Sequence, residues 1–459
     1  MWSDFNPNNI AAYTRVRLRT TKKPLLVATL LISVAIIGIV LKVKPVLNPV
    51  IFQPSASRRG NFQPIMNGPS RSKHDGLWYG LIQPYQAFFY SAFYDDRKSI
   101  GTLPSVRIVA VTEPIEEGKK LFCKLFYEGK KQPFITEAEI AFIGAGIVQF
   151  GKLFKESLIS CQLRDEDIPS TVSLTADAQD RPVFYMPVEL PPKPEVKENF
   201  VVCVSVTYWK HEPHRIVEWM ELLRGMGVSL VTIYNNSLSE DAGKVFQYYD
   251  STGFVDFRQS HNFVALEGEH TIHMHMSPVI NDCMYRNMYS FKKIIVTDLD
   301  EVIVPRDYST YAELLVYLDQ LYPGEHPARH YIFTNAYFFT DFPKQSDVSS
   351  HLATLAYRIR LPESEVGYAA KSIIDPQACI NMHNHVCWGN TNLYNTDGYL
   401  VFVDGHVALN QHYKKCHFTP AECMEQMTVS GLDNIMLRYK DYLYKAIPPV
   451  LRALNLDPL

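Results

Sequence analysis

An uncharged apolar run near the N-terminus is the feature that most constrains this chain. Leu25–Leu41 (LLVATLLISVAIIGIVL) has no charged residue, and its seventeen positions are at the lower end of the helix length that crosses about 30 Å of hydrocarbon. Five basic residues precede the run, whereas two follow it closely. Because positive charge stays on the cytosolic side of a membrane, we expect a signal-anchor helix with a cytosolic N-terminus and a lumenal remainder, which is type II topology.

A cleaved signal peptide is the alternative interpretation of this run. No small-x-small cleavage site follows it, and the run is longer than the roughly 7–15 apolar residues of most signal peptides. A short span suits the thinner membranes of the early secretory pathway, since longer spans sort toward the plasma membrane. We therefore expect a Golgi membrane location rather than the cell surface.

All eight cysteines follow the predicted anchor, which places them in a compartment where disulfides form. The pairs Cys379–Cys387 and Cys416–Cys423 are close enough in sequence to close small loops, but spacing alone does not fix the connectivity. Cys203 lies inside the apolar run VVCVSV and is equally compatible with a buried free thiol.

Two histidine clusters have metal-ligand residue types without a convincing metal-binding pattern. His383 and His385 lie between Cys379 and Cys387, but an oxidising lumen favours a disulfide there over structural zinc. The three histidines between positions 270 and 275 fit no metal-binding spacing, and we expect them in a helix or loop.

Composition divides the chain into segments. Proline, serine, asparagine, glycine and arginine dominate from Pro45 to Asp75, and short β-branched and aromatic runs follow. The stretch Pro191–Glu198 (PPKPEVKE) separates these runs from the next region. The expected order is a cytosolic tail (1–24), the signal-anchor transmembrane helix (25–41), a stem (42–75), a β-rich accessory domain (76–195), an α/β domain (196–430) and a C-terminal helical tail (431–459).

The α/β domain begins with alternating strand and helix patterns. The predicted order is a buried strand at Phe200–Val206, a helix from Pro213 to Gly227, a strand at Ser229–Tyr234, a helix at Asp241–Asp250 and a short strand at Phe254–Phe257. Such a unit forms a parallel sheet, whose ligand crevice lies at the carboxyl ends of the strands. Functional residues are therefore expected directly after each strand.

Two aspartates follow a further buried strand, Ile294–Thr297. Side chains alternate along an extended chain, so Asp298 and Asp300 are expected to point the same way. Two carboxylates so close repel each other unless a cation lies between them, and a hard divalent ion held by oxygens also binds phosphates. The pattern predicts a Mg²⁺ or Mn²⁺ site for a nucleotide-sugar diphosphate. An acidic turn that caps the next helix is the alternative interpretation.

Five stretches between about 200 and 425 have a specific order and spacing: Glu218–Asn236, Tyr248–Gln259, Phe291–Arg306, Lys371–Pro376 and Ala408–Cys416. Together they resemble glycosyltransferase family 92. The resemblance implies a GT-A fold, a UDP-galactose donor and inverting β-1,4 transfer to a glycan acceptor on a glycoprotein or glycolipid. Leu223 occupies a position where we would expect histidine, so a contact of that helix is expected to differ here.

Four residues after the first two strands are candidates for donor binding. Asn235 and Asn236 follow the second strand, where a uracil or ribose edge would be hydrogen-bonded. Thr207 and Tyr208 follow the first strand and would form the other wall of that pocket. An asparagine-rich turn without a ligand is the alternative.

The resemblance and the residue chemistry both assign the metal and donor motif to Asp298 and Asp300. His412 matches a C-terminal His-Tyr element of the family and would complete the metal shell through its imidazole, although a hydrogen-bonded core histidine has the same appearance in sequence. Lys371 would pair with the donor diphosphate, with an exposed lysine as the alternative.

An inverting transfer needs a carboxylate base that accepts the proton of the acceptor hydroxyl. Glu363, Glu365 and Asp404 lie in plausible acceptor-side segments, and the sequence does not choose among them. The alternative functions are an inactive, membrane-tethered glycan-binding or scaffold protein and a transferase for another UDP-sugar. A homodimer is left open, whereas the formal net charge of -3 argues against a generally basic nucleic-acid binder.

Overall fold

The computed structural model describes residue 76 and residues 78–459, apart from 82–85, 116–118, 150–151, 262–269, 324–329 and 391–399. The predicted tail, signal anchor and stem lie outside these residues. Within the described part, none of the helices has the length and apolar character needed to cross a membrane. All of these described residues belong to one compact unit of the chain.

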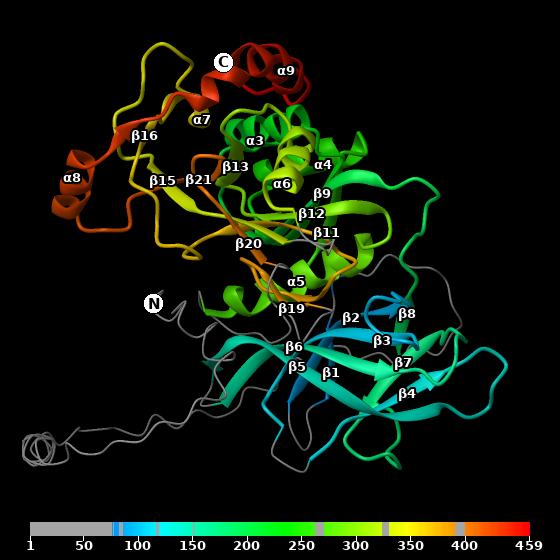
Figure 1. Ribbon diagram of the computed structural model, residues 1–459. Helices are drawn as coiled ribbons and strands as arrows, with labels where there is room; N and C mark the ends of the chain where they lie inside the picture. The colour runs from blue at the N-terminus through cyan, green and yellow to red at the C-terminus, as the bar shows by residue number, and fades with distance from the viewer. Residues whose placement is uncertain are drawn as a thin grey trace, which may run out of the picture. The chain divides into compact units, whose positions relative to one another are not determined.

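The first part of this unit is a β-barrel (Figure 1). Its sheet has the order β1-β2-β3-β6-β5-β4-β7-β8, and β8 returns to pair with β2, which closes strands β2 to β8 into a ring. The inward side chains form one apolar cluster that includes Phe89, Ile108 and Leu174. The strands are β1 (Tyr79–Leu81), β2 (Ala87–Asp95), β3 (Ser105–Thr112), β4 (Phe122–Phe126), β5 (Phe134–Gln149), β6 (Lys152–Gln162), β7 (Thr171–Thr175) and β8 (Met186–Glu189).

A mixed seven-stranded sheet of the described residues follows, in the order β11-β10-β9-β12-β17-β14-β20. Strands β9 to β12 run parallel, and β17 is antiparallel to both of its neighbours. The predicted alternation of strands and helices is confirmed. The strands are β9 (Glu198–Trp209), β10 (Leu230–Leu238), β11 (Val255–Gln259), β12 (Phe291–Thr297), β14 (His330–Phe333), β17 (Lys371–Ile374) and β20 (Leu400–Val403).

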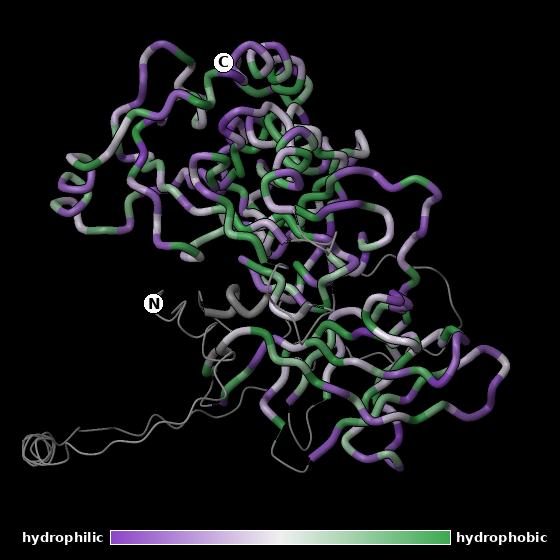
Figure 2. Tube along the Cα trace, viewed as in Figure 1, coloured by the Kyte–Doolittle hydropathy of each residue, from purple (hydrophilic) through white to green (hydrophobic). Residues whose placement is uncertain are grey.

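Alternation along β9 explains how the two faces of this sheet are covered. Val202 and Val204 pack in the cluster formed with helices α3 (Pro213–Gly225) and α4 (Glu240–Ser251). Val201 and Cys203 point to the other face and pack with helix α5 (His270–Asn287), which contains the three clustered histidines. Figure 2 shows hydrophobic residues concentrated along the buried strands.

A smaller sheet, in the order β13-β21-β15, extends from the end of β12. The C-terminal segment, predicted as a separate tail, packs into the same core as α3 through Leu443, Ile447 and Leu451. The remaining elements are β13 (Glu301–Pro305), α6 (Tyr311–Leu321), β15 (Asn335–Phe339), α7 (Ala353–Ala356), β16 (Ile359–Arg360), β18 (Cys379–Met382), β19 (Cys387–Asn390), β21 (Ala408–Lys414), α8 (Pro420–Thr428), β22 (Gly431–Leu432), the 3-10 helix η3 (Ile435–Tyr439) and α9 (Lys440–Ala453).

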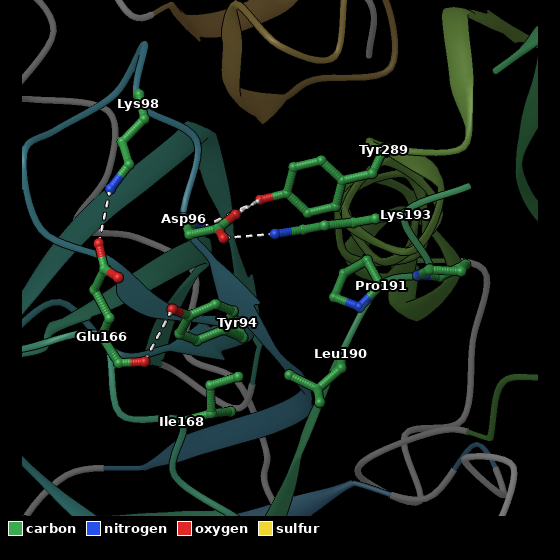
Figure 3. Close-up of a pocket in the computed structure, with 10 residues that line it drawn as sticks. Tyr94, Asp96, Lys98, Glu166, Ile168, Leu190, Pro191, Lys193 and Tyr289 are labelled. Atoms are coloured by element: carbon green, nitrogen blue, oxygen red, sulfur yellow. Dashed lines mark hydrogen bonds and ion pairs between the residues drawn. The ribbon is translucent and has the colours of Figure 1, made fainter. Parts of the chain in front are cut away.

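The barrel and the larger sheet share a hydrophobic core. Tyr90, Phe93 and Leu158 of the barrel pack in one cluster with α5 and β9. Arg286 of α5 also forms an ion pair with Glu189 at the end of β8. A cavity of about 570 Å³ lies beside this junction, and its ionic side chains pair with one another (Figure 3). None of the candidate site residues predicted from the sequence lines that cavity.

All eight cysteines lie in the described residues and form four disulfides: Cys123–Cys161, Cys203–Cys283, Cys379–Cys387 and Cys416–Cys423. The two short loops are as predicted. The alternative of a free thiol at Cys203 is wrong, because this residue faces α5 and bonds a cysteine 80 positions further along the chain. A partner so distant in sequence leaves no spacing signal.

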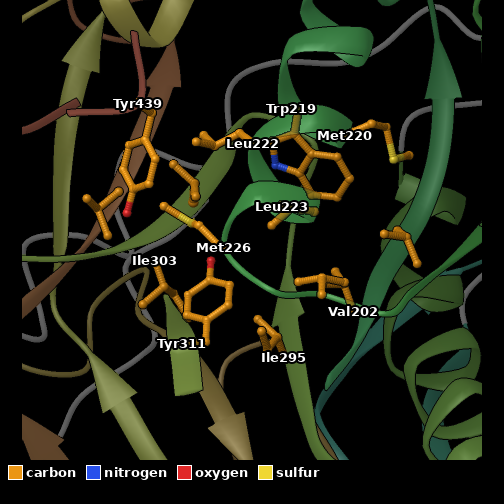
Figure 4. Close-up of a cluster of buried hydrophobic side chains, with 14 of the residues drawn as sticks. Val202, Trp219, Met220, Leu222, Leu223, Met226, Ile295, Ile303, Tyr311 and Tyr439 are labelled. Carbon is orange, nitrogen blue, oxygen red and sulfur yellow. The ribbon is translucent and has the colours of Figure 1, made fainter. Parts of the chain in front are cut away.

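Leu223 is fully buried in the core between α3 and the sheet, among Val202, Met226 and Ile295 (Figure 4). Leu223, at the position where histidine was expected, therefore makes an apolar packing contact. We predict that Leu223→Ala lowers the free energy of unfolding by about 2–5 kcal/mol, as is usual for truncated core leucines. Urea denaturation followed by tryptophan fluorescence measures the loss. Leu103→Ala, at a position whose side chain is 40% exposed, is the control, and equal losses in both variants would contradict the packing argument.

Candidate active site

The segment Asp298–Glu301 is a turn that joins β12 to β13. The Glu301 amide donates a hydrogen bond to the Asp298 carbonyl at 3.1 Å, and the Tyr413 amide donates to the Asp300 carbonyl at 2.7 Å. The chain turns here because β12 and β13 belong to different sheets. The expectation of an extended chain through Asp298 and Asp300 is therefore wrong, and the two carboxylates have different partners.

Asp300 belongs to a cluster with Glu301 and His412, which we call the acid–histidine cluster. His412 Nε2 lies 3.3 Å from Asp300 Oδ2, and His412 Nδ1 lies 2.8 Å from Glu301 Oε1. Glu301 and His412 face each other in the antiparallel pairing of β13 with β21. The indole of Trp219 donates to the Glu301 carbonyl at 2.8 Å, which fixes the start of β13.

Asp298 is held by two neighbouring strands of the larger sheet. It accepts a hydrogen bond from the Ser205 hydroxyl on β9, and its Oδ2 lies 2.6 Å from Lys371 Nζ on β17. Lys371 also lies 3.4 Å from Glu301 Oε2, and its side chain is 1% exposed. The alternative of an exposed lysine is thus wrong. Lys371 connects Asp298 to the acid–histidine cluster.

Opposite charges set the protonation of the cluster. Burial by itself would raise the pKa of Asp300, but His412 outweighs this effect and lowers that pKa to about 2. Burial by itself would lower the pKa of His412, but Glu301 and Asp300 raise it to about 9. Burial also opposes the charged form of Lys371, whose pKa is nevertheless raised by Asp298 and Glu301. At neutral pH His412 in the cluster and the neighbouring Lys371 are therefore both positively charged.

The acid–histidine cluster has the ligand set and spacing for a divalent ion. One ligand atom from each of its three residues lies within 4.8 Å of the others, comparable with the roughly 4 Å between ligands on opposite sides of Mg²⁺. Glu301 Oε2 and His412 Nδ1 are buried and make no hydrogen bond of normal geometry. Carboxylate and imidazole ligands suit Mn²⁺ as well as Mg²⁺. The structure brings Asp300 and His412 together as predicted and adds Glu301, while Asp298 pairs with Lys371.

The predicted donor residues lie at the carboxyl ends of β9 and β10, beside the strand that leads to Asp298. Thr207 and Asn235 are paired in register, and Tyr208 is the next residue of β9. Thr207 is buried and donates its hydroxyl to the Tyr234 carbonyl at 2.7 Å. Asn235 Nδ2 donates to Gln259 Oε1 at 3.1 Å. The Thr207 and Asn235 side chains therefore hydrogen-bond within the strand ends at which the donor site is predicted.

Asn236 makes the neighbouring contact on the same strand. Its Nδ2 donates to the Ser260 carbonyl at 2.8 Å, and the Ser260 amide donates to the Asn235 carbonyl at 2.9 Å. The segment Gln259–Ser260 therefore holds both asparagines through main-chain and side-chain contacts.

The candidate bases occupy two places. Asp404 caps a turn before β21 by accepting from the His406 amide, and the Glu363 carboxylate lies against Gly405 in the same turn. His412 lies near the far end of β21, about 13 Å beyond the first residue of that strand at ~3.3 Å per residue. The structure therefore does not bring Glu363 or Asp404 to the cluster. Glu365 is exposed in the loop that leads into Lys371.

We predict that the metal-free protein loses stability as the pH rises from about 6.5 through about 9. The pKa of His412 is higher in the folded state than its ordinary value of 6.5, so the protonated imidazole stabilises the fold fully below pH 6.5, and this contribution disappears as the ring deprotonates near pH 9. Melting temperatures in EDTA between pH 6 and 9.5 test this. His412→Gln should flatten the dependence, whereas His406→Gln, at an exposed position, should keep it. A dependence unchanged in His412→Gln would refute the assignment.

Comparison with known proteins assigns this chain to a family. The sequence pattern of "Glycosyltransferase family 92" matches residues 198–443. "Glycosyltransferase family 92 protein F13G3.3" from Caenorhabditis elegans is 23% identical over 261 residues, and the match covers 54% of this chain. It covers 48% of that protein, so this chain spans about half the length of its curated relative.

Two solved structures share a weaker likeness. "Crystal structure of S. aureus TarS 1-349 in complex with UDP" has a TM-score of 0.27 at 10% identity and covers 55% of this chain and 70% of that one. "Mannosyltransferase PcManGT from Pyrobaculum calidifontis in complex with GDP-Man and Mn2+" has a TM-score of 0.27 at 12% identity, with 57% and 75% covered. These scores are too low to inform the chemistry of this chain. The match over more than half of its residues shows that the chain belongs to glycosyltransferase family 92.

Proposed function

We propose that this protein is a metal-dependent hexosyltransferase that moves galactose from UDP-galactose to a glycan acceptor. The observation that carries the proposal is the convergence of Asp300, Glu301 and His412 at the carboxyl end of β12, in the domain that matches the family. The crevice of a parallel sheet lies at the carboxyl ends of its strands. Thr207, Asn235 and the acidic turn all lie at that edge, as a GT-A arrangement requires.

Asp300, Glu301 and His412 would hold Mn²⁺ or Mg²⁺. A bound divalent ion neutralises the charge that develops on a departing nucleotide diphosphate. Asp298 has a different part in this proposal. It orients the buried Lys371, which contacts Oε2 of Glu301 while His412 contacts Oε1, and so holds that carboxylate in place. Asn235 and Asn236, whose side-chain amides are held by Gln259 and Ser260, would lie beside the nucleoside.

Transfer with inversion is a single displacement. The acceptor hydroxyl oxygen forms a bond to the anomeric carbon, the bond from that carbon to the UDP oxygen breaks, and the hydroxyl proton passes to a carboxylate. Glu365 suits that role best among the three candidates, because the Glu363 carboxylate lies against Gly405 and Asp404 caps the same turn, about 13 Å along β21 from His412 at ~3.3 Å per residue. Tyr368, whose amide donates to the Glu365 carbonyl at 2.9 Å, packs against a cluster with Tyr337, whose ring centre lies 5.1 Å from that of His412.

The membrane location belongs to the same proposal. The apolar segment 25–41, its flanking charges and the position of all eight cysteines after it support a type II protein of the Golgi membrane. The four disulfides are consistent with a lumenal domain. The acceptor would be a glycan on a glycoprotein or glycolipid.

We predict that Asp300→Asn lowers UDP-galactose turnover in Mn²⁺ roughly a hundredfold or more, because a ligand of the charge-stabilising ion is lost. Turnover is measured against a panel of UDP-sugars, with and without EDTA. Asp241→Asn is the control, since that carboxylate is 73% exposed on α4. Turnover that survives both Asp300→Asn and EDTA would refute metal dependence.

The inactive scaffold has a separate test. If the wild-type protein transfers no sugar, and UDP with Mn²⁺ does not raise its melting temperature, the inactive scaffold is the correct alternative.

A second prediction separates the candidate bases. Glu365→Gln should lower kcat about a hundredfold or more while the donor KM stays close to the wild-type value, since a general base acts on the acceptor in the transition state. Glu363→Gln is the matched control, because it changes an exposed glutamate two residues away in the same loop. Equal kcat values for the two variants would remove Glu365 from the mechanism.

A further inference from the structure

We infer that Gly76 and Trp78 at the entry to the barrel, here called the entering segment, act together with Tyr90 as a positioning clamp for Asn235 and Asn236, the predicted nucleotide-binding asparagines. This inference rests on the proposed function, because it assigns the clamped residues Asn235 and Asn236 to the donor site. It gives the barrel a part in donor binding that no comparison assigns.

The entering segment is hydrogen-bonded to the chain just after β11. The Gly76 carbonyl accepts from the His261 amide at 3.1 Å, and the Trp78 indole donates to the His261 carbonyl at 2.9 Å. Both bonds link residues that are more than 180 positions apart. The segment thus lies against the carboxyl end of β11, the edge strand that pairs with β10.

Gly76 also fits Gln259 in a way that no other residue can. Its φ of +79° is in the left-handed region, and a Cβ at this position would overlap the carbonyl oxygen and carbon of Gln259. The close approach of the two backbones therefore requires glycine. Any larger residue must displace either the entering segment or Gln259.

Tyr90, on the face of strand β2 that packs against α5, contacts the same residue. Its hydroxyl donates to the Gln259 carbonyl at 3.1 Å, and its ring centre lies 4.9 Å from that of Trp78. Tyr90 is 1% exposed, within the core shared by the barrel and α5. Gln259 is therefore contacted by a rigid part of the barrel as well as by the entering segment.

The other side of Gln259 reaches the predicted donor residues. Its Oε1 accepts from Asn235 Nδ2, and the adjacent Ser260 exchanges contacts with Asn235 and Asn236 through its main chain. A continuous path of hydrogen bonds thus joins the barrel to both asparagines. Because side chains that are already oriented bind without an ordering cost, displacing Gln259 should weaken nucleotide binding.

The experiment compares two glycines of the barrel region in the full chain, purified in detergent. Gly76→Ala adds left-handed strain and the overlap with Gln259. Gly129→Ala adds the same kind of strain, at φ +73°, but no atom lies within 4 Å of the new Cβ. Binding of UDP in Mn²⁺ is measured by calorimetry, and kcat and the donor KM are measured with UDP-galactose.

Gly76→Ala should weaken UDP binding and raise the donor KM roughly three- to thirtyfold, as expected for coupling through contiguous residues, with kcat within about twofold of wild type. Gly129→Ala should lower the melting temperature without changing either constant. If Gly76 has only a structural role, Gly76→Ala should also lower the melting temperature without changing UDP affinity or the donor KM. That outcome would overturn the clamp.

A pair of tyrosines keeps the test informative if Gly76→Ala does not fold. Tyr90→Phe removes only the hydroxyl that donates to Gln259, whereas Tyr94→Phe removes a hydroxyl of the same strand that donates to the Glu166 carbonyl at 3.4 Å. UDP affinity should fall in Tyr90→Phe alone. Equal affinities in the two variants overturn the clamp while leaving the transferase intact. A wild-type protein that neither binds UDP nor turns over any UDP-sugar overturns the proposed function itself, and the clamp with it.

Discussion

The charge pairing around Lys371 is the interaction on which the site depends. Three carboxylates occur within four residues at the end of β12, and in a partly buried position their mutual repulsion would favour protonation or a different turn. Lys371 on β17 contacts Asp298 and Glu301. His412 on β21 contacts Asp300 and Glu301. Removing either cation would leave a buried charge without a partner, which costs more than the pair contributes.

The position of these cations follows from the topology of the sheets. Strand β17 enters the larger sheet antiparallel to β12, so Lys371, at the start of β17, lies beside the end of β12. Strand β21 pairs with β13 in the smaller sheet and carries His412 opposite Glu301. The acidic turn is thus where the two sheets separate, and each sheet supplies one cation. A local motif acquires its chemistry from strands that are 70 and 110 positions further along the chain.

The sequence predicted what local patterns encode. Alternating strands and helices, the two short disulfide loops, and the presence of Asp300 and His412 at one site all follow from periodicity, spacing or family resemblance. It did not predict Glu301, because only the pairing of β13 with β21 places that residue opposite His412. It also missed the turn at Asp298 and the bond between Cys203 and Cys283, since both depend on where distant elements pack. The burial of Lys371 was missed for the same reason, because it depends on the packing of β17 between β12 and β14.

The bond between Cys203 and Cys283 sets a condition on how the chain can be produced. It closes a loop of 80 residues that contains α3, β10, α4 and β11. The loop therefore includes Asn235 and Asn236, which are proposed to lie beside the nucleotide. A cross-link over such a loop restricts the unfolded chain by roughly 4–5 kcal/mol in the chain-entropy description. Synthesis in a reducing bacterial cytoplasm would withhold that contribution, so heterologous expression calls for a secretory host or an oxidising refolding step.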